Sequence, residues 1–194
     1  GMEAALCNFI EPGDEVIVFE PYYGYHCNLL TVMGAKLRFI QTTGPDWKID
    51  FEAVEALITD KTKAIVVTTP GNPNGKVWTR SELEKIAALL EKHDICAITD
   101  EIYEYMLYDG REHISLASLP GAFERTITLS GFSKTYNMTG WRLGYAVGPE
   151  AIIEKMGLLS DLIYICAPTP LQHGVAEAFE MDDGYFDEMA SSYA

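Results

Sequence analysis

Short apolar runs rich in β-branched residues alternate along the chain with longer amphipathic segments. Runs of this kind are typical of buried strands, whereas apolar residues that recur on one face are typical of helices. The apolar runs predict strands over residues 15–20, 35–41, 63–70, 95–103, 125–130 and 142–148. The amphipathic segments predict helices over residues 2–10, 21–34, 51–58, 79–94 and 150–164.

Strands that alternate with helices indicate an α/β protein, because each crossover helix must cover one face of a largely parallel sheet. We therefore predict a mixed, mostly parallel sheet of about six strands, with helices on both faces. Thr79 followed by Glu82 predicts a capping box at the start of helix 79–94. Repeats, low-complexity tracts and linkers are not apparent, so residues 1–194 are predicted to form one domain.

Polar side chains gather where the predicted strands end. In open α/β sheets, ligands bind beyond the carboxyl ends of the strands, so these side chains are the first place to look for a site. Four strands contribute to this edge: Tyr22, Tyr23 and His26; Asn72 and Asn74; Asp100 and Tyr103; Ser130, Ser133 and Lys134.

The charge of the chain narrows the range of partners. A formal net charge of −15 and a pI of about 4.5 argue against binding to nucleic acid or to anionic lipid, both of which attract basic surfaces. No apolar run approaches the roughly 20 residues of a membrane span, and no secretory signal pattern opens the chain. These features predict a cytoplasmic protein without a membrane partner.

Cysteines and histidines do not suggest a metal site. No pair of cysteines has zinc-ligand spacing, so all four are predicted to be buried thiols in a reducing compartment. They are Cys7, Cys27, Cys96 and Cys166. The four histidines are widely scattered, and we expect His93 and His113 to be exposed.

Lys134 stands among small residues directly after a predicted strand, and Arg142 follows eight positions later. A lysine that attacks an aldehyde needs such a setting, because it must lose its proton to become a nucleophile. Asp100 could face a pyridine nitrogen, and Arg142 could hold a phosphate. The combination of amine, carboxylate and guanidinium suggests pyridoxal 5′-phosphate.

Four motifs carry a resemblance to a known family. They are EPGDEVIVFEPYYGYH (11–26), PGNPNG (70–75), TDEIYE (99–104) and SGFSKTYNMTGWRLGYAVGP (130–149). Together they resemble class I/II aminotransferases, the fold-type I pyridoxal-phosphate enzymes that include aspartate aminotransferase. The resemblance implies an antiparallel last strand, a homodimer, and a chain that corresponds to the cofactor-binding large domain, incomplete at both ends and without the small domain.

The same resemblance implies roles for the residues at the strand ends. Lys134 would form a Schiff base with the cofactor and move a proton of the substrate. Asp100 would keep the pyridine nitrogen protonated, and Tyr103 and Asn72 would hydrogen-bond the phenolic oxygen of the ring.

Further residues would complete the cofactor site. Tyr23 would stack on the ring, Arg142 would bind the phosphate, and Ser133 or Ser130 would add a hydrogen bond to it. His26 occupies the position of a partner to the aspartate. The backbone of Gly1 and Met2 stands where family members cradle the phosphate.

The function implied is transfer of an amino group between an amino acid and a 2-oxo acid. A carbon–sulfur β-lyase dependent on the same cofactor shares all these motifs and remains an alternative. A non-catalytic module that binds the cofactor or a partner is the other alternative, because the arginine that binds the substrate carboxylate in the family belongs to the small domain.

Overall fold

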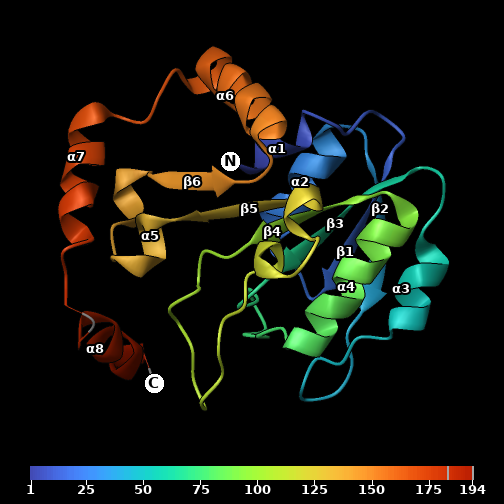
Figure 1. Cartoon of the computed structure of the whole chain (residues 1–194), viewed down its shortest axis with the longest axis horizontal. Helices are drawn as coiled ribbons and strands as arrows, with labels where there is room; N and C mark the ends of the chain where they lie inside the picture. The colour runs from blue at the N-terminus through green and yellow to red at the C-terminus, as the bar shows by residue number, and fades with distance from the viewer. Residues whose placement is uncertain (183, 194) are drawn as a thin grey trace.

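The computed structural model describes residues 1–182 and 184–193, and its centre is a six-stranded sheet (Figure 1). The strand order is β2-β1-β3-β4-β5-β6. The first five strands run parallel, and β6 pairs antiparallel with β5. The strands are β1 (Glu15–Glu20), β2 (Lys36–Gln41), β3 (Thr62–Thr68), β4 (Cys96–Asp100), β5 (Thr126–Gly131) and β6 (Gly144–Val147). The predicted mixed, mostly parallel sheet is confirmed.

Helices connect the strands and cover both faces of the sheet. They are α1 (Met2–Leu6), α2 (Gly24–Val32), α3 (Phe51–Leu57), α4 (Arg80–His93), α5 (Phe132–Thr135), α6 (Glu150–Tyr164), α7 (Thr169–Ala178) and α8 (Gly184–Tyr193). Single 3₁₀ turns are η1 (Leu116–Ser118), η2 (Phe123–Arg125) and η3 (Thr139–Trp141). Figure 1 shows α3 and α4 over one face, while the arm from α6 through α7 to α8 extends past β6.

Two hydrophobic cores lie on opposite sides of the sheet, because successive side chains of a strand point to opposite faces. On β1, Ile17 and Phe19 pack in the core that contains residues of α3 and α4. Val16 and Val18 pack instead with residues of α1, α2 and α6. A strand buried on both faces explains why its sequence is continuously apolar rather than alternating.

The start of α4 is fixed by side chains. The Thr79 hydroxyl accepts a hydrogen bond from the Glu82 backbone N–H, and the Glu82 carboxylate accepts one from the Thr79 N–H, which confirms the predicted capping box. The same carboxylate forms an ion pair of 2.7 Å with the buried amine of Lys76. Glu82 therefore ties the loop after β3 to the first turn of α4.

Several element boundaries differ from those predicted, and the backbone gives the reasons. Helix α2 begins at Gly24 rather than at residue 21, because Tyr23, in the N-cap position, has an extended backbone. Strand β4 ends at Asp100, since the Glu104 N–H turns back to the Glu101 carbonyl. Strand β6 begins at Gly144, after Arg142 adopts a left-handed conformation (φ 58°).

Helix α7 was not predicted, because Pro168 before it and Pro170 and Gly174 within it are usually signals of loops. Here the helix begins directly after Pro168, and Pro170 lies in its first turn, where a missing N–H costs no hydrogen bond. The predicted helix 2–10 is shortened to α1 because residues 7–9 form turns.

Exposure corrects two further expectations. Cys27 is buried and Cys96 is partly buried, but Cys7 and Cys166 are exposed, contrary to the prediction that all four thiols are buried. Cys7 lies in the turn after α1 and Cys166 in the segment between α6 and α7, and connecting segments run over the surface of a protein. The His113 side chain is only 14% exposed and lies 2.8 Å from the Glu101 carboxylate, whereas we expected it in solvent.

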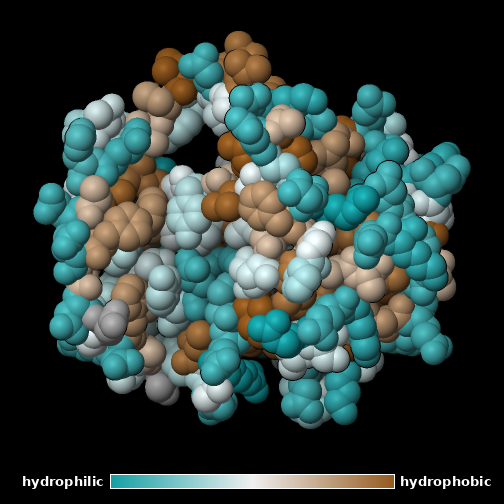
Figure 2. Space-filling model, in the orientation of Figure 1, coloured by the Kyte–Doolittle hydropathy of each residue, from teal (hydrophilic) through white to brown (hydrophobic). Residues whose placement is uncertain are grey.

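Helix α6 presents apolar side chains to solvent. Leu158, Leu162, Ile163 and Ile165 at its end are between 56% and 82% exposed. Figure 2 shows hydrophobic residues at the top of the molecule, over this helix. Among the described residues, none of the helices combines the length and the hydropathy needed to cross a membrane.

Candidate active site

An open pocket of about 540 Å³ lies at the carboxyl ends of the strands. Its lining comes from segments far apart in the sequence: Met2, Tyr23, His26, Asn72, Asp100, Ile102, Tyr103, Leu129, Ser130, Ser133, Lys134, Thr139 and Arg142. Ten of the eleven residues that the sequence nominated are in this set; the eleventh, Gly1, is not. The parallel sheet brings them together, because β1, β3, β4 and β5 all end at this edge.

Lys134 lies in α5, the single helical turn that follows β5 directly. This turn can begin where it does because β5 and β6 approach very closely at Gly131 and Gly144. A Cβ atom added at Gly131 would lie 2.9 Å from the Gly144 Cα and from the Leu143 carbonyl oxygen. The two glycines therefore set the path on which Lys134 enters the pocket.

Asp100 is held in place by partners from two directions. Its Oδ2 lies 2.9 Å from Nε2 of His26, and its Oδ1 accepts a hydrogen bond of 3.3 Å from the Ile102 N–H. The His26 side chain is 7% exposed and that of Asp100 is 18% exposed. These two contacts fix the orientation of the carboxylate at the edge of the pocket.

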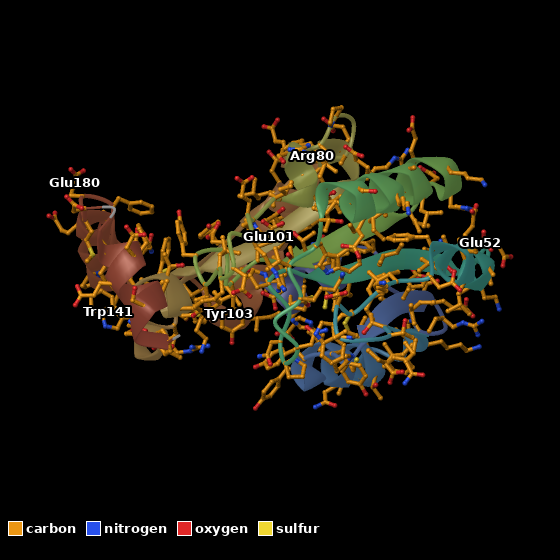
Figure 3. All side chains as sticks on the ribbon, turned by 90° about the horizontal axis from the view of Figure 1, so that it is seen from below. Glu52, Arg80, Glu101, Tyr103, Trp141 and Glu180 are labelled. Atoms are coloured by element: carbon orange, nitrogen blue, oxygen red, sulfur yellow. The ribbon has the colours of Figure 1, made fainter. Side chains whose placement is uncertain are left out.

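Tyr103 lies between an amide and the lysine. The Asn72 side-chain amide donates a hydrogen bond of 3.4 Å to the Tyr103 hydroxyl, and the Lys134 Nζ lies 5.7 Å from the centre of the Tyr103 ring. Figure 3 labels Tyr103 together with Glu101, both just beyond the end of β4. The hydroxyl, the amide and the amine thus converge on one part of the pocket.

Tyr23, the residue before α2, and Arg142, the residue after η3, also line the pocket. Burial is the main cause that raises the pKa of Tyr23, and the negative charge of Asp100 adds to the increase. Arg142 is exposed, and its guanidinium donates a hydrogen bond of 2.7 Å to the Thr139 carbonyl. Within the residues that the structure describes it forms no ion pair, so its charge is available to an anion.

Of the two serines and the first two residues of the chain, all but Gly1 line this pocket. Ser133 and Met2 line the pocket. Ser130 also lines it, but its hydroxyl is within hydrogen-bond distance of the Glu104 carboxylate (3.1 Å) and the Glu101 carbonyl (3.3 Å). Gly1 borders the adjoining hollow between β6 and α6, which Ser130 also borders.

Sequence reasoning missed Ile102, Leu129 and Thr139 as lining residues, and it missed Glu101 directly behind the pocket. Apolar and hydroxyl residues at strand ends carry no chemical signature. For Glu101 a signal existed, because alternation along β4 sends it to the face opposite Asp100, where a charge needs partners.

The arrangement suits one kind of ligand. It offers an amine, a carboxylate braced by a histidine, a phenol with an amide beside it, and an unpaired guanidinium. A molecule with an aldehyde, a basic ring nitrogen, a ring hydroxyl and a phosphate would match these groups one by one. No group of three or more histidines, cysteines and acidic residues able to hold a metal occurs in the described part of the chain.

Comparison with known proteins identifies similar sequences. A family model described as aminotransferase class I and II matches residues 1–194. Kynurenine–oxoglutarate transaminase 3 of Rattus norvegicus is 40% identical over 195 residues, which cover 95% of this chain and 43% of that protein. Kynurenine–oxoglutarate transaminase 1 of Homo sapiens is 37% identical over 195 residues, which cover 95% of this chain and 46% of that protein.

Solved structures agree with the sequence matches. N-succinyldiaminopimelate aminotransferase from Mycobacterium tuberculosis has a TM-score of 0.94 and 32% identity, over 98% of this chain and 50% of that one. Aromatic aminotransferase from Pyrococcus horikoshii has a TM-score of 0.94 and 36% identity, over 99% of this chain and 52% of that one. The chain thus spans about half the length of the proteins that it matches.

Proposed function

Because the chain belongs to the class I and II aminotransferase family, we propose that it carries the cofactor-binding half of an enzyme that transfers an amino group between an amino acid and a 2-oxo acid. Members of this family depend on pyridoxal 5′-phosphate. The observation that carries the proposal is the convergence of Lys134, Asp100 and Arg142 on one pocket. Amine, carboxylate and guanidinium are the groups that this cofactor requires.

The residues of the pocket fit the cofactor by charge and hydrogen bonding. Arg142 would bind the phosphate, with Ser133 beside it, and Asp100 would hold a proton on the ring nitrogen. Tyr103 and Asn72 would bind the ring hydroxyl, and Tyr23 would cover the ring. When bound, the cofactor supplies an electron-poor ring that stabilises negative charge on the carbon next to the substrate amine.

Lys134 is proposed as the residue that holds the cofactor and moves the substrate proton. Its Nζ would bind the aldehyde and, when the substrate amine replaces it, would take the proton from the substrate α-carbon. His26 would keep the Asp100 carboxylate oriented, since it lies on the carboxylate oxygen Oδ2. The other pocket walls would orient the substrate and limit the access of water.

The substrates are proposed by class. Two relatives with 37% and 40% identity are transaminases of kynurenine and oxoglutarate, which supports an aromatic amino donor and 2-oxoglutarate as acceptor. Residues 143–194 contain no arginine, so the group that pairs with the distal carboxylate of 2-oxoglutarate would have to come from elsewhere.

Transfer of nitrogen tests the proposal. We expect the chain, loaded with pyridoxal 5′-phosphate, to move ¹⁵N from labelled kynurenine or another aromatic amino acid to 2-oxoglutarate, with labelled glutamate detected by mass spectrometry. Release of pyruvate and ammonia from cystathionine, without transfer, would instead identify a carbon–sulfur β-lyase. Cofactor binding with neither product would contradict an enzymatic function for this chain and favour a binding module.

A homodimer is proposed from the apolar side chains on α6. Leu158 and Leu162 are 69% and 82% exposed, and contacts with a second copy would remove this surface from water. We expect sedimentation velocity to give a dimer that the double substitution Leu158→Lys and Leu162→Lys converts to a monomer. The same pair of substitutions at exposed polar positions, Glu154 and Asp161, should leave the dimer intact. A monomeric parent chain would contradict the proposal.

We also propose a domain assignment and a cellular compartment for the chain. Residues 1–194 are proposed to belong to the cofactor-binding large domain. The cytoplasm is proposed as the compartment, supported by four free cysteines, two of them exposed. The net charge of −15 supports small-molecule substrates rather than nucleic acid or an anionic membrane.

A further inference from the structure

Glu101 is a buried residue whose carboxylate lies within hydrogen-bond distance of three side chains. It is 2% exposed, and its Oε1 accepts hydrogen bonds from the hydroxyls of Thr99 (2.9 Å) and Ser115 (3.0 Å). Its Oε2 lies 2.8 Å from Nε2 of His113. When the carboxylate is ionised it can only accept hydrogen bonds, and Nε2 is then the ring nitrogen that carries the hydrogen. A carboxylate so deeply buried requires such partners, and here the loop that returns to the sheet at His113 and Ser115 provides two of them.

The backbone of Glu101 connects this network to the pocket. Its N–H donates to the Leu129 carbonyl of β5 (2.8 Å), and its carbonyl accepts from the Glu104 N–H (3.0 Å). The turn closed in this way holds Tyr103, and the residue before Glu101 is Asp100. Successive side chains alternate, so Asp100 points into the pocket while Glu101 points to the opposite face with Thr99.

We propose that Glu101 is a positioning residue. Its carboxylate contacts Thr99, His113 and Ser115, and these contacts fix the turn that places Asp100 and Tyr103 in the pocket with Lys134. The proposal rests on the proposed function in that Asp100, Tyr103 and Lys134 would hold the cofactor. Two anchors act on the turn. One is the pair of backbone hydrogen bonds of Glu101, and the other is its side chain, which blocks rotation of the peptide that follows Asp100.

The geometry distinguishes this carboxylate from others in the chain. Glu55 also contacts a histidine, with 3.0 Å between its Oε1 and Nε2 of His93, but its side chain is 39% exposed and lies on α3, away from the pocket. Both contacts are Glu–His pairs, yet only the one at Glu101 is buried and adjacent to two pocket residues. Glu55→Gln is therefore a matched control for Glu101→Gln.

Hydrogen–deuterium exchange of the protein without cofactor tests the turn directly. We expect Glu101→Gln to speed exchange in the peptide that contains Ile102, Tyr103 and Glu104 by about 10-fold, because a glutamine oxygen cannot satisfy three donors. His113→Gln keeps a donor at the position of Nε2 and should change exchange little, whereas His113→Leu should speed it. Glu55→Gln should have no effect on this peptide.

The cofactor-loaded protein gives the second readout. For Glu101→Gln we expect weaker binding of pyridoxal 5′-phosphate by about 10-fold and a shift of about one unit in the pH midpoint of its visible absorption band. A residue that only stabilises the fold would lower the unfolding temperature but leave both quantities unchanged. Unchanged exchange in the turn together with an unchanged pH midpoint would overturn the proposal.

Failure of the Glu101 variant to fold and failure of the parent chain to bind the cofactor can each be told apart from failure of the proposal. If Glu101→Gln does not fold, the same exchange measurement is made on Ser115→Ala and His113→Leu, each of which removes one donor to the carboxylate. Exchange at the parent rate in both variants would overturn the proposal. If the parent chain shows no visible band, the proposed function fails, whereas exchange in the unloaded protein still shows whether Glu101 orders the turn.

Discussion

Lys134→Ala is expected to lower amino-group transfer by about 10⁴-fold, the upper range of what a positioned acid–base group contributes. The reason is that the Lys134 amine has two roles, since it would both hold the cofactor and take the proton from the substrate α-carbon. Alanine should leave the pocket walls intact, because Lys134 is half-buried on the single helical turn α5 and its amine lies 5.7 Å from the centre of the Tyr103 ring. Folding should therefore be preserved.

Reductive labelling provides the direct measurement. The protein is mixed with pyridoxal 5′-phosphate, reduced with borohydride and digested, and the modified peptide is mapped by mass spectrometry. We expect one pyridoxyl adduct, on the peptide that contains Lys134, and none in the Lys134→Ala variant. Lys85→Ala is the matched control, since this lysine lies on α4 over the Phe51 ring of α3 and does not line the pocket.

The contrary result is equally clear. If the label spreads over surface lysines, or if Lys134→Ala is labelled and active like the parent, Lys134 does not hold the cofactor. In that case the chain's membership of the family would stand, because it rests on sequence, while the assignment of the pocket would have to be abandoned.

The sheet was predictable from sequence because its strands are buried on both faces. Val16, Ile17, Val18 and Phe19 supply an uninterrupted apolar run that few other structures accommodate. The edges of elements were less predictable, since they depend on single backbone conformations. The left-handed conformation of Arg142, which delays the start of β6, is one example.

The candidate site was predictable to the extent that it consists of strand ends. Asp100, Tyr103 and Lys134 each follow a recognisable run, and the parallel topology then brings them to one edge. The side of the sheet on which Glu101 lies was predictable from alternation, but its contact with His113 was not. Glu101 and His113 meet only because a loop returns to the sheet, and no periodicity in sequence encodes that contact.

Asp100→Asn is expected to slow transfer by roughly 10²–10³-fold, the typical cost of removing one preorganised electrostatic group from an active site. Asparagine has nearly the same shape, and its side-chain oxygen can still accept the hydrogen bond from the Ile102 N–H. It lacks the negative charge, so it cannot hold a proton on the ring nitrogen of the cofactor. Electron withdrawal by the ring would then be weaker when the substrate proton leaves.

Stability separates this effect from damage to the fold. The Asp100 side chain is 18% exposed, and removing its charge also removes a cost of desolvation, so we expect the free energy of unfolding to change by less than about 1 kcal/mol. Asp46→Asn, in an exposed turn, is the control for loss of one negative charge from an already acidic chain. It should leave both the rate and the stability unchanged.

A cofactor with a permanent charge makes the test specific. Pyridoxal 5′-phosphate methylated on the ring nitrogen stays positively charged without any carboxylate beside it. The Asp100→Asn variant should therefore transfer nitrogen at least about 10-fold faster with this analogue than with the natural cofactor. The same analogue should give no gain with the parent chain, where Asp100 would already keep the nitrogen charged. If Asp100→Asn transfers nitrogen at the parent rate, or if the analogue restores nothing, the Asp100 charge does not act on the ring nitrogen. The carboxylate would then serve only to hold His26 and the Ile102 N–H, 2.9 Å and 3.3 Å from its two oxygens.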